Sequence, residues 1–238
     1  MSQPALQGRA ALVTGVSRRT GIGAAIARRL ATLGADLFLC GWSAHDAAQP
    51  WGADPDGIEV MEADFLDRDA PAAVMAAAVE ARGHVDILVA NHARSDHLRL
   101  ADTTADELDA QWAVNARATL LLVQGFASQH DGRAGGRVVM LTSGQHRGPM
   151  PGELGYVATK GAIHQVTRTL AAELVGRGIT VNTVNPGATD TGWATAEQRA
   201  RVPVWGKPDD GARLIGWLCT DDAQWITGEV IDSTGGPW

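Results

Sequence analysis

Short apolar runs alternate with helical patterns along this chain, and that alternation constrains the fold more than any other feature. A short apolar run reads as a buried strand, whereas apolar residues spaced three and four apart read as one face of a helix. Strands that alternate with helices form a parallel sheet with helices on both faces. We therefore expect an α/β protein with a doubly wound parallel sheet of about seven strands, in a single domain over residues 1–238. The expected strands are 10–13, 36–41, 58–63, 85–90, 136–141, 179–184 and 228–231, and the expected helices are 24–33, 71–81, two within 103–130, 153–174 and 208–220.

Length, charge and cysteine usage narrow the class of protein. With 238 residues the chain can bury one sizeable core. Its net charge of −7, without a basic cluster, argues against nucleic acid and membrane surfaces as partners. It has no run of about 18 apolar residues and no signal-peptide pattern in residues 1–8. Cys40 and Cys219 stand in apolar stretches, as buried thiols of a reducing compartment would. We expect a cytoplasmic protein without a metal site.

A glycine-rich stretch, residues 15–23, joins the first expected strand to the first expected helix. Gly15, Gly21 and Gly23 allow a tight backbone there, and the helix N-terminus presents free N–H groups and the positive end of its dipole. A pyrophosphate needs both features, so this context favours a dinucleotide site on a Rossmann-type sheet. The alternative is an ordinary strand-to-helix turn.

The end of the second expected strand bears on the choice of dinucleotide. Proteins that bind NAD usually place an acidic residue there for the ribose hydroxyls, but residues 40–43 contain no carboxylate. Arg18 and Arg19 lie in the glycine loop, where guanidinium groups would suit a 2′-phosphate unless both face solvent. Trp42 either stacks near the adenine or covers the edge of the sheet. The pattern favours NADP(H), with NAD(H) possible.

Tyr156 and Lys160 are the strongest candidates for catalysis. Tyr156 is the only tyrosine, Lys160 is one of two lysines, and a separation of four places them on one face of a helix. A phenol titrates near ~10, and a nearby ammonium group lowers that pKa toward the working range. Ser143, expected at a strand end, could hydrogen-bond a substrate oxygen, and Asn115 stands in mid-helix, where an asparagine is unfavourable without a reason. The alternative reading is a buried tyrosine anchor beside a solvated lysine.

These residues all fall at the carboxyl ends of expected strands or in the helices that follow, which is where such sheets bind ligands. With the glycine loop in place, the chain resembles the short-chain dehydrogenase/reductase family over nearly its whole length. Asn115, Ser143, Tyr156 and Lys160 match the catalytic tetrad of that family, with the usual separation of serine and tyrosine. Among its members, the chain looks most like those named 3-oxoacyl-carrier-protein reductases.

The resemblance also implies a set of cofactor contacts. The glycine motif is longer by two residues than the family pattern, and the family's Asn-Asn-Ala-Gly appears as residues 90–93, where Asn91 is retained. Asp64 matches the residue that contacts the adenine amino group, and residues 186–191 match the segment that holds the nicotinamide carboxamide. The resulting cofactor-binding set is Gly15, Ser17, Arg18, Arg19, Gly21, Ile22, Gly23, Trp42, Ser43, Asp64, Phe65, Asn91, Tyr156, Lys160, Pro186, Gly187, Thr189 and Thr191.

The mechanism that the resemblance implies is hydride transfer between the nicotinamide ring and a substrate carbon. Tyr156 would give or take the proton on the substrate oxygen, and Lys160 would lower the tyrosine pKa and hydrogen-bond the nicotinamide ribose. Ser143 would orient the carbonyl, and Asn115 would hold a water in a proton relay. The leading hypothesis is therefore an NADP(H)-dependent carbonyl reductase or alcohol dehydrogenase.

Two other functions share this fold. A cofactor-binding sensor or scaffold would lack turnover, although the tyrosine and the lysine are both present in register. An epimerase usually needs a longer substrate domain than the residues after 184 provide, and a dehalogenase is a further possibility. We expect a small or medium carbonyl substrate, a flexible lid around 189–207, and a homotetramer with a dimer as the alternative. The candidates for the pocket wall are His92, Arg94, Gln145, His146, Met150, Glu153, Leu154 and Trp193.

Overall fold

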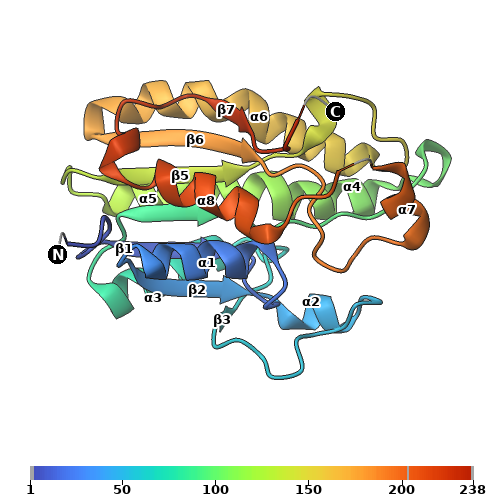
Figure 1. Cartoon of the computed structure of the whole chain (residues 1–238), viewed down its shortest axis with the longest axis horizontal. Helices are drawn as coiled ribbons and strands as arrows, with labels where there is room; N and C mark the ends of the chain where they lie inside the picture. The colour runs from blue at the N-terminus through green and yellow to red at the C-terminus, as the bar shows by residue number, and fades with distance from the viewer. Residues whose placement is uncertain (1–2, 203, 237–238) are drawn as a thin grey trace.

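The computed structural model describes residues 3–202 and 204–236, which form one seven-stranded parallel sheet between two layers of helices. The strand order is β3-β2-β1-β4-β5-β6-β7. In Figure 1, α1 and α8 lie over one face of the sheet, and α3, α5 and α6 lie over the other. The expected doubly wound, Rossmann-type sheet is confirmed. The strands are β1 Ala10–Thr14, β2 Asp36–Gly41, β3 Met61–Glu62, β4 Ile87–Ala90, β5 Gly136–Leu141, β6 Ile179–Asn185 and β7 Val230–Asp232.

The helices follow local signals in the sequence. Pro71 stands in the first turn of α3, where a missing N–H costs nothing, and Gly83 ends that helix with φ 76°. Thr104 caps α4 by accepting the N–H of Glu107. The helices are α1 Ile22–Thr32, α2 Ser43–Ala47, α3 Ala70–Arg82, α4 Ala105–Gln111, α5 Ala118–Gln129, α6 Leu154–Leu174, α7 Ala196–Arg201 and α8 Pro208–Leu218.

The core has two layers because the central strands are buried on both faces. Successive residues of β1 show this: Leu12 belongs to the cluster under α3, α5 and α6, whereas Val13 belongs to the cluster under α1 and α8. Cys40 and Cys219 are both buried and free, as expected, and burial raises the pKa of each thiol to about 12. The apolar runs of the sequence are therefore explained by packing against helices on two sides.

The order of the strands creates a topological switch point at β1. β1 pairs with β2 on one side and with β4 on the other, so the chain leaves β1 in one direction and later returns to its opposite side. At such a switch point the loops after the two neighbouring strands diverge and leave room for a ligand. The glycine loop follows β1 and Asn91 follows β4, so both stand at this switch point.

Three segments differ from expectation. Only Met61–Glu62 of the expected strand 58–63 pairs with β2, because Ile58 and Val60 pack against the core instead of joining the ladder. The stretch 42–57, which lies outside every expected helix and strand, contains α2, and the expected lid 189–207 contains α7. Neither short helix has an apolar periodicity long enough to be detected from sequence. Residue 203 of the expected lid lies outside the described residues.

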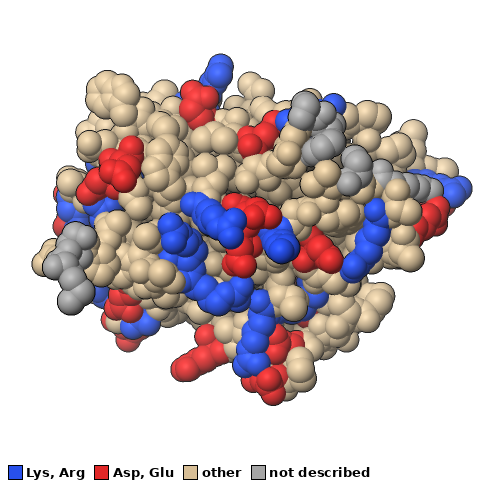
Figure 2. All heavy atoms as spheres, viewed as in Figure 1, with Lys and Arg blue, Asp and Glu red and all other residues tan. Residues whose placement is uncertain are grey.

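Positive and negative side chains are interspersed on the face that carries α1 and α8 (Figure 2). Arg28 of α1 lies 3.7 Å from Asp209 of α8, and Arg213 lies 2.9 Å from Asp210. This face therefore lacks the one-sided positive charge that a nucleic-acid surface needs. Across residues 3–202 and 204–236, no helix is both long enough and apolar enough to span a membrane.

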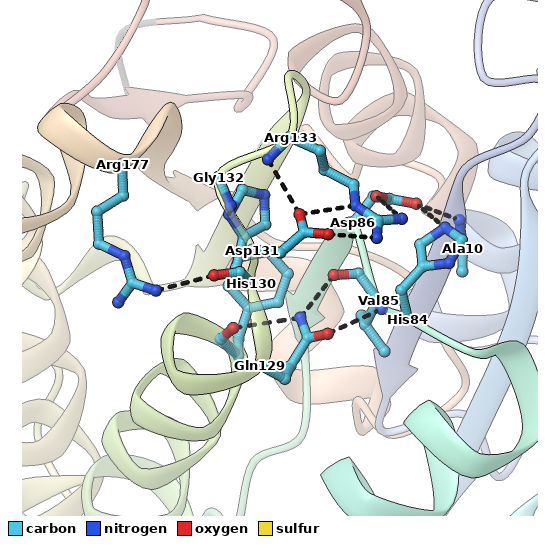
Figure 3. A network of polar contacts seen from close by, with 11 residues as sticks. Ala10, His84, Val85, Asp86, Gln129, His130, Asp131, Gly132, Arg133 and Arg177 are labelled. Carbon is cyan, nitrogen blue, oxygen red and sulfur yellow. Dashed lines mark hydrogen bonds and ion pairs between the residues drawn. The ribbon is translucent and has the colours of Figure 1, made fainter.

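A network of polar contacts joins the amino ends of the central strands, at the edge of the sheet opposite the glycine loop (Figure 3). Asp86, which is 3% exposed, accepts the N–H of Ala10 at 2.8 Å and lies 2.9 Å from His84 Nε2. The side-chain amide of Gln129 both donates to and accepts from the backbone of Val85. The network joins the starts of β1 and β4 to the end of α5.

Asp86→Ala is expected to lower the free energy of unfolding by roughly 2–4 kcal/mol, because it leaves the Ala10 N–H without its buried acceptor and removes the carboxylate that His84 and the Arg133 guanidinium face. Urea unfolding at pH 7 measures the change. Asp131→Ala is the matched control: that carboxylate is exposed and pairs with Arg133, so little change is expected. Equal effects of the two substitutions would contradict a structural role for Asp86.

Candidate active site

The glycine loop is packed so tightly that side chains are excluded at two of its positions. Gly15 has φ 71°, and a Cβ there would lie 2.8 Å from Asn91 Nδ2. A Cβ on Gly23 would lie 2.2 Å from the carbonyl oxygen of Gly15. The Asn91 amide donates to the carbonyls of Thr14 and Gly15, at 3.2 and 3.0 Å. The loops after β1 and β4 are thus fastened together, and Asn91 acts here as a brace for the glycine loop.

The N-terminus of α1 suits the pyrophosphate of a dinucleotide. Gly21 stands at the cap with no side-chain hydrogen bond to the first turn, and the first turn carries no acidic residue. Free N–H groups and an uncompensated dipole end attract an anion. Together with the space left by Gly15 and Gly23, these features fit a dinucleotide; the contact expected of Ile22, the first residue of α1, stays a prediction.

The structure brings the four expected catalytic residues together at the carboxyl edge of β5. Ser143 follows β5, and Tyr156 and Lys160 lie one turn apart on α6. The side chain of Ser143 lies close enough to the Tyr156 phenol to lower its pKa. Lys160 Nζ donates to the Leu141 carbonyl at 2.9 Å and lies 5.7 Å from the centre of the Tyr156 ring.

The electrostatics of this pair differ from the sequence prediction. Burial raises the pKa of Tyr156 to about 12, against the lowering effect of the Ser143 hydrogen bond, and the Glu153 carboxylate raises it further. Burial also lowers the pKa of Lys160 to about 8. The expected lowering of the tyrosine pKa by Lys160 is therefore not found: burial sets the direction, and Lys160 is not among the groups that shift this pKa. The phenol keeps its proton at neutral pH, which is the form that can act as an acid.

The hydrogen bonds of Asn115 explain why an asparagine stands inside a helix. It is fully buried in a π-helical segment, Trp112–Arg117, between α4 and α5. Its side-chain amide pairs with both the N–H and the C=O of Arg94, at 2.7 and 2.8 Å, and donates to Thr159 at 3.0 Å. π-Helical turns are frequent at functional sites. Asn115 thus ties the loop after β4 to α6 beside Tyr156; the water relay expected of it stays a prediction.

His92 lies inside the protein rather than in the wall of a pocket. Its Nε2 is 3.1 Å from the Val114 carbonyl, which can only accept, so Nε2 carries the proton and Nδ1 accepts from Thr14 Oγ1 at 2.7 Å. Burial and the charge of Lys160 lower the pKa of His92 to about 3. The ring contacts Phe65 in a tilted arrangement, with 4.3 Å between the ring centres. A neutral His92 therefore braces the expected cofactor-binding Phe65 and the glycine loop.

Several of the other candidates for the pocket wall already pair with side chains of the protein. Arg94 pairs with Asp96 at 2.7 Å and with Glu107 at 3.1 Å, so it does not offer an unpaired charge to an anionic substrate. Gln145 donates to Thr142, and His146 lies 3.1 Å from Asp232. The remaining candidates surround the start of α6 and the expected lid: Met150, Glu153, Leu154 and Trp193.

Both arginines of the glycine loop meet carboxylates from the segment 42–57. Arg18 Nε lies 3.3 Å from Asp46, and Arg19 Nη1 lies 2.7 Å from Asp56. Ser43 donates to Glu62 through its N–H, at 2.8 Å, and through its hydroxyl. Sequence reasoning missed Asp46, which is buried on α2. The sequence was searched for a carboxylate only at the end of β2. The fold of α2 brings Asp46 beside the glycine loop, which the sequence does not reveal.

The remaining residues of the expected cofactor-binding set lie just after the carboxyl ends of β2, β3 and β6. Asp64 follows β3 and accepts the N–H of Leu66 at 2.9 Å, and Trp42, between β2 and α2, is 38% exposed. After β6, Gly187 has φ 69°, and Pro186 accepts a hydrogen bond from Thr189 Oγ1 at 3.2 Å. Thr189 and Thr191 are both buried. Within the described residues, no group of three or more His, Cys, Asp or Glu side chains is placed to hold a metal ion.

Comparison with known proteins agrees with this geometry. The family model described as "Enoyl-(Acyl carrier protein) reductase" matches residues 15–237. An uncharacterized oxidoreductase, YjdA, of Bacillus subtilis (strain 168) is 40% identical over 246 residues, covering 97% of each chain.

Solved structures are similar over the whole fold. A short-chain dehydrogenase from Burkholderia cenocepacia J2315 in complex with NADP has a TM-score of 0.85 and 35% identity, covering 98% of this chain and 99% of that one. The angucycline C-6 ketoreductase LanV with bound NADP has a TM-score of 0.86 and 31% identity, covering 98% and 96%. Because both the family model and these relatives match nearly its full length, the chain belongs to the short-chain dehydrogenase/reductase family and is an oxidoreductase.

Proposed function

We propose that this enzyme is an NADP(H)-dependent ketoreductase, which interconverts a carbonyl compound and a secondary alcohol. The observation that carries the proposal is the cluster of Ser143, Tyr156 and Lys160 beside a glycine loop that suits a dinucleotide. A similar structure is named as a ketoreductase with bound NADP, which supports both the reaction and the cofactor.

In the proposed reaction, the dinucleotide supplies or receives the hydride when bound. The N-terminus of α1 holds the pyrophosphate, and Pro186, Gly187 and the two threonines after them hold the nicotinamide end. Ser143 orients the substrate oxygen, and Tyr156 donates the proton to that oxygen during reduction. Lys160, charged below about pH 8, favours loss of the tyrosine proton at that moment.

The preference for NADP(H) rests on the end of β2, where Gly41, Trp42 and Ser43 present no carboxylate to a 2′-phosphate. The carboxylates nearby are already engaged: Glu62 by Ser43, and Asp46 by Arg18. We expect kcat/KM with NADPH to exceed that with NADH by about tenfold or more, which is the contribution of one charge-assisted contact to the 2′-phosphate; Arg19 of the glycine loop is the candidate for that contact. NAD(H) is the alternative, and an equal or reversed ratio would establish it.

For the substrate we propose a small or medium carbonyl compound, and for the assembly a homotetramer in the cytoplasm, with a dimer as the alternative. Leu108 and Trp112 are 39% and 49% exposed on the helices near Asn115, where paired helices between subunits would cover them. Light scattering after size exclusion separates the assemblies.

The function is tested by following consumption of NADPH and NADH by absorbance across β-ketoacyl thioesters, diketones, β-keto esters and quinones. Turnover with any member of this panel supports the ketoreductase and names its substrate class. Tight binding of the dinucleotide without turnover of any compound in the panel would favour a cofactor sensor of the same fold.

A further inference from the structure

Arg18 bridges two segments that flank the glycine loop. On one side, its Nε lies 3.3 Å from Asp46 of α2. On the other, its Nη1 donates to the backbone carbonyl of Thr191 at 3.1 Å, across 173 positions of sequence. Figure 1 shows that α2 and the chain leading to α7 both lie beyond the carboxyl ends of the strands. A single side chain thus connects the segment 42–57 with the segment 186–193.

The anchor of this bridge is buried and fully engaged. Asp46 is 6% exposed and also accepts hydrogen bonds from the Ser17 hydroxyl and, at 2.9 Å, from the Trp51 indole N–H. The Arg18 guanidinium lies over the Trp51 ring, 5.2 Å from its centre. The cation is therefore held by charge on one edge and by an aromatic ring on one face, so its position is set before any ligand binds.

The charge balance of the pair limits what Arg18 can recognise. Asp46 neutralises it, so the pair offers no net positive charge to a 2′-phosphate, and turning Arg18 toward that phosphate would strand a buried carboxylate. The two segments it joins are those expected at the adenosine end and at the nicotinamide end of the cofactor. Holding both in place lowers the ordering cost of binding either dinucleotide.

We propose that Arg18 is a clasp that joins these two segments across the cofactor groove, and that it retains NADH and NADPH alike instead of selecting between them. Asp46 and Trp51 are the positioning residues that hold the clasp. This inference rests on the proposed use of a dinucleotide and goes beyond it, because it assigns the loop arginine to closure of the groove.

The first test is titration of the full-length enzyme with NADH and with NADPH, followed by nucleotide fluorescence, which needs no substrate. Arg18→Ala is expected to raise both dissociation constants by a similar factor, roughly tenfold, because charge-assisted hydrogen bonds on both sides are lost. Arg18→Lys, which keeps the charge but cannot make both contacts, is expected to weaken both as well. Arg213→Ala removes an exposed arginine paired with Asp210 and is expected to change neither constant.

A second variant reverses the charge argument. Asp46→Asn keeps the shape: its amide oxygen can still accept from the Trp51 indole, and its NH2 group can donate to the Ser17 hydroxyl, but it leaves Arg18 with an uncompensated charge. We expect NADPH to bind more tightly relative to NADH, by at least about threefold. An unchanged ratio would contradict neutralisation of Arg18 by Asp46.

The outcomes separate this inference from the function on which it rests. If Arg18→Ala weakens NADPH alone, Arg18 reads the 2′-phosphate and the clasp is overturned. If Arg18→Ala and Arg18→Lys bind both dinucleotides like the wild type, the clasp is overturned while the proposed function stands. If the wild type binds neither dinucleotide, the proposed function itself fails, and the inference fails with it.

Discussion

Tyr156→Phe is expected to lower kcat for carbonyl reduction by about 10²–10⁴-fold, the usual contribution of a positioned general acid. The substitution removes one hydroxyl and keeps the ring, so dinucleotide affinity should hardly change. No other phenol can replace it, because Tyr156 is the only tyrosine in the chain. Steady-state rates with NADPH and the best substrate of the panel measure the loss.

Thr167→Val is the matched control for that variant. Thr167 is a buried hydroxyl on the same helix, and it donates to Ile163 at 2.9 Å and contacts Thr183 at 2.7 Å, away from the catalytic cluster. Its loss is expected to cost about 1 kcal/mol of stability and to leave kcat nearly unchanged. A Tyr156→Phe enzyme that keeps more than about a tenth of the wild-type kcat would remove Tyr156 from its proposed role.

Lys160→Met is expected to abolish most turnover and, at the same time, to stabilise the fold. Burial lowers the pKa of Lys160 from 10.5 to about 8, which corresponds to a penalty of about 3 kcal/mol for the charged form in the folded state. Loss of the hydrogen bond to the Leu141 carbonyl offsets about 1 kcal/mol of the gain. We therefore expect the free energy of unfolding at pH 7 to rise by roughly 2 kcal/mol.

The pH dependence identifies the cause of that gain. Between about pH 8 and 10.5 the unfolded chain holds the lysine proton and the folded chain does not, so wild-type stability rises with pH in this window. The advantage of Lys160→Met should be full below pH 8 and vanish above about pH 10.5. Denaturant unfolding at several pH values measures it, and Lys207→Met, at the other, exposed lysine, is the control for loss of a surface lysine. A variant less stable than the wild type at pH 7 would refute the argument.

The same titration bears on activity. Reduction needs a protonated Tyr156, which burial secures to about pH 12, and a charged Lys160. The wild-type rate of reduction should therefore fall as the pH rises through about 8. This alkaline fall in the pH–rate profile follows the pKa of Lys160 rather than that of Tyr156.

The sequence by itself determined the parallel sheet and the pairing of Tyr156 with Lys160 on one helix face. Both depend on short-range spacing: apolar runs alternate with helical patterns, and a separation of four along α6 places Tyr156 and Lys160 on one face whatever surrounds them. Asn115 could be singled out because an asparagine is unfavourable in a helix, and the structure supplied the reason in its pairing with the backbone of Arg94.

Only the tertiary structure decided the properties that depend on burial and on loops meeting at a distance. The pKa of Tyr156 moves opposite to expectation because desolvation is set by the packing around α6, which spacing does not encode. His92 is a neutral brace because Thr14 and Val114 converge on it. Asp46 reaches Arg18, and Arg18 reaches Thr191, because segments far apart in sequence leave the same edge of the sheet. Spacing along the sequence shows which residues lie in strands and helices. Contacts between loops depend on the order of the strands in the sheet, which spacing does not show.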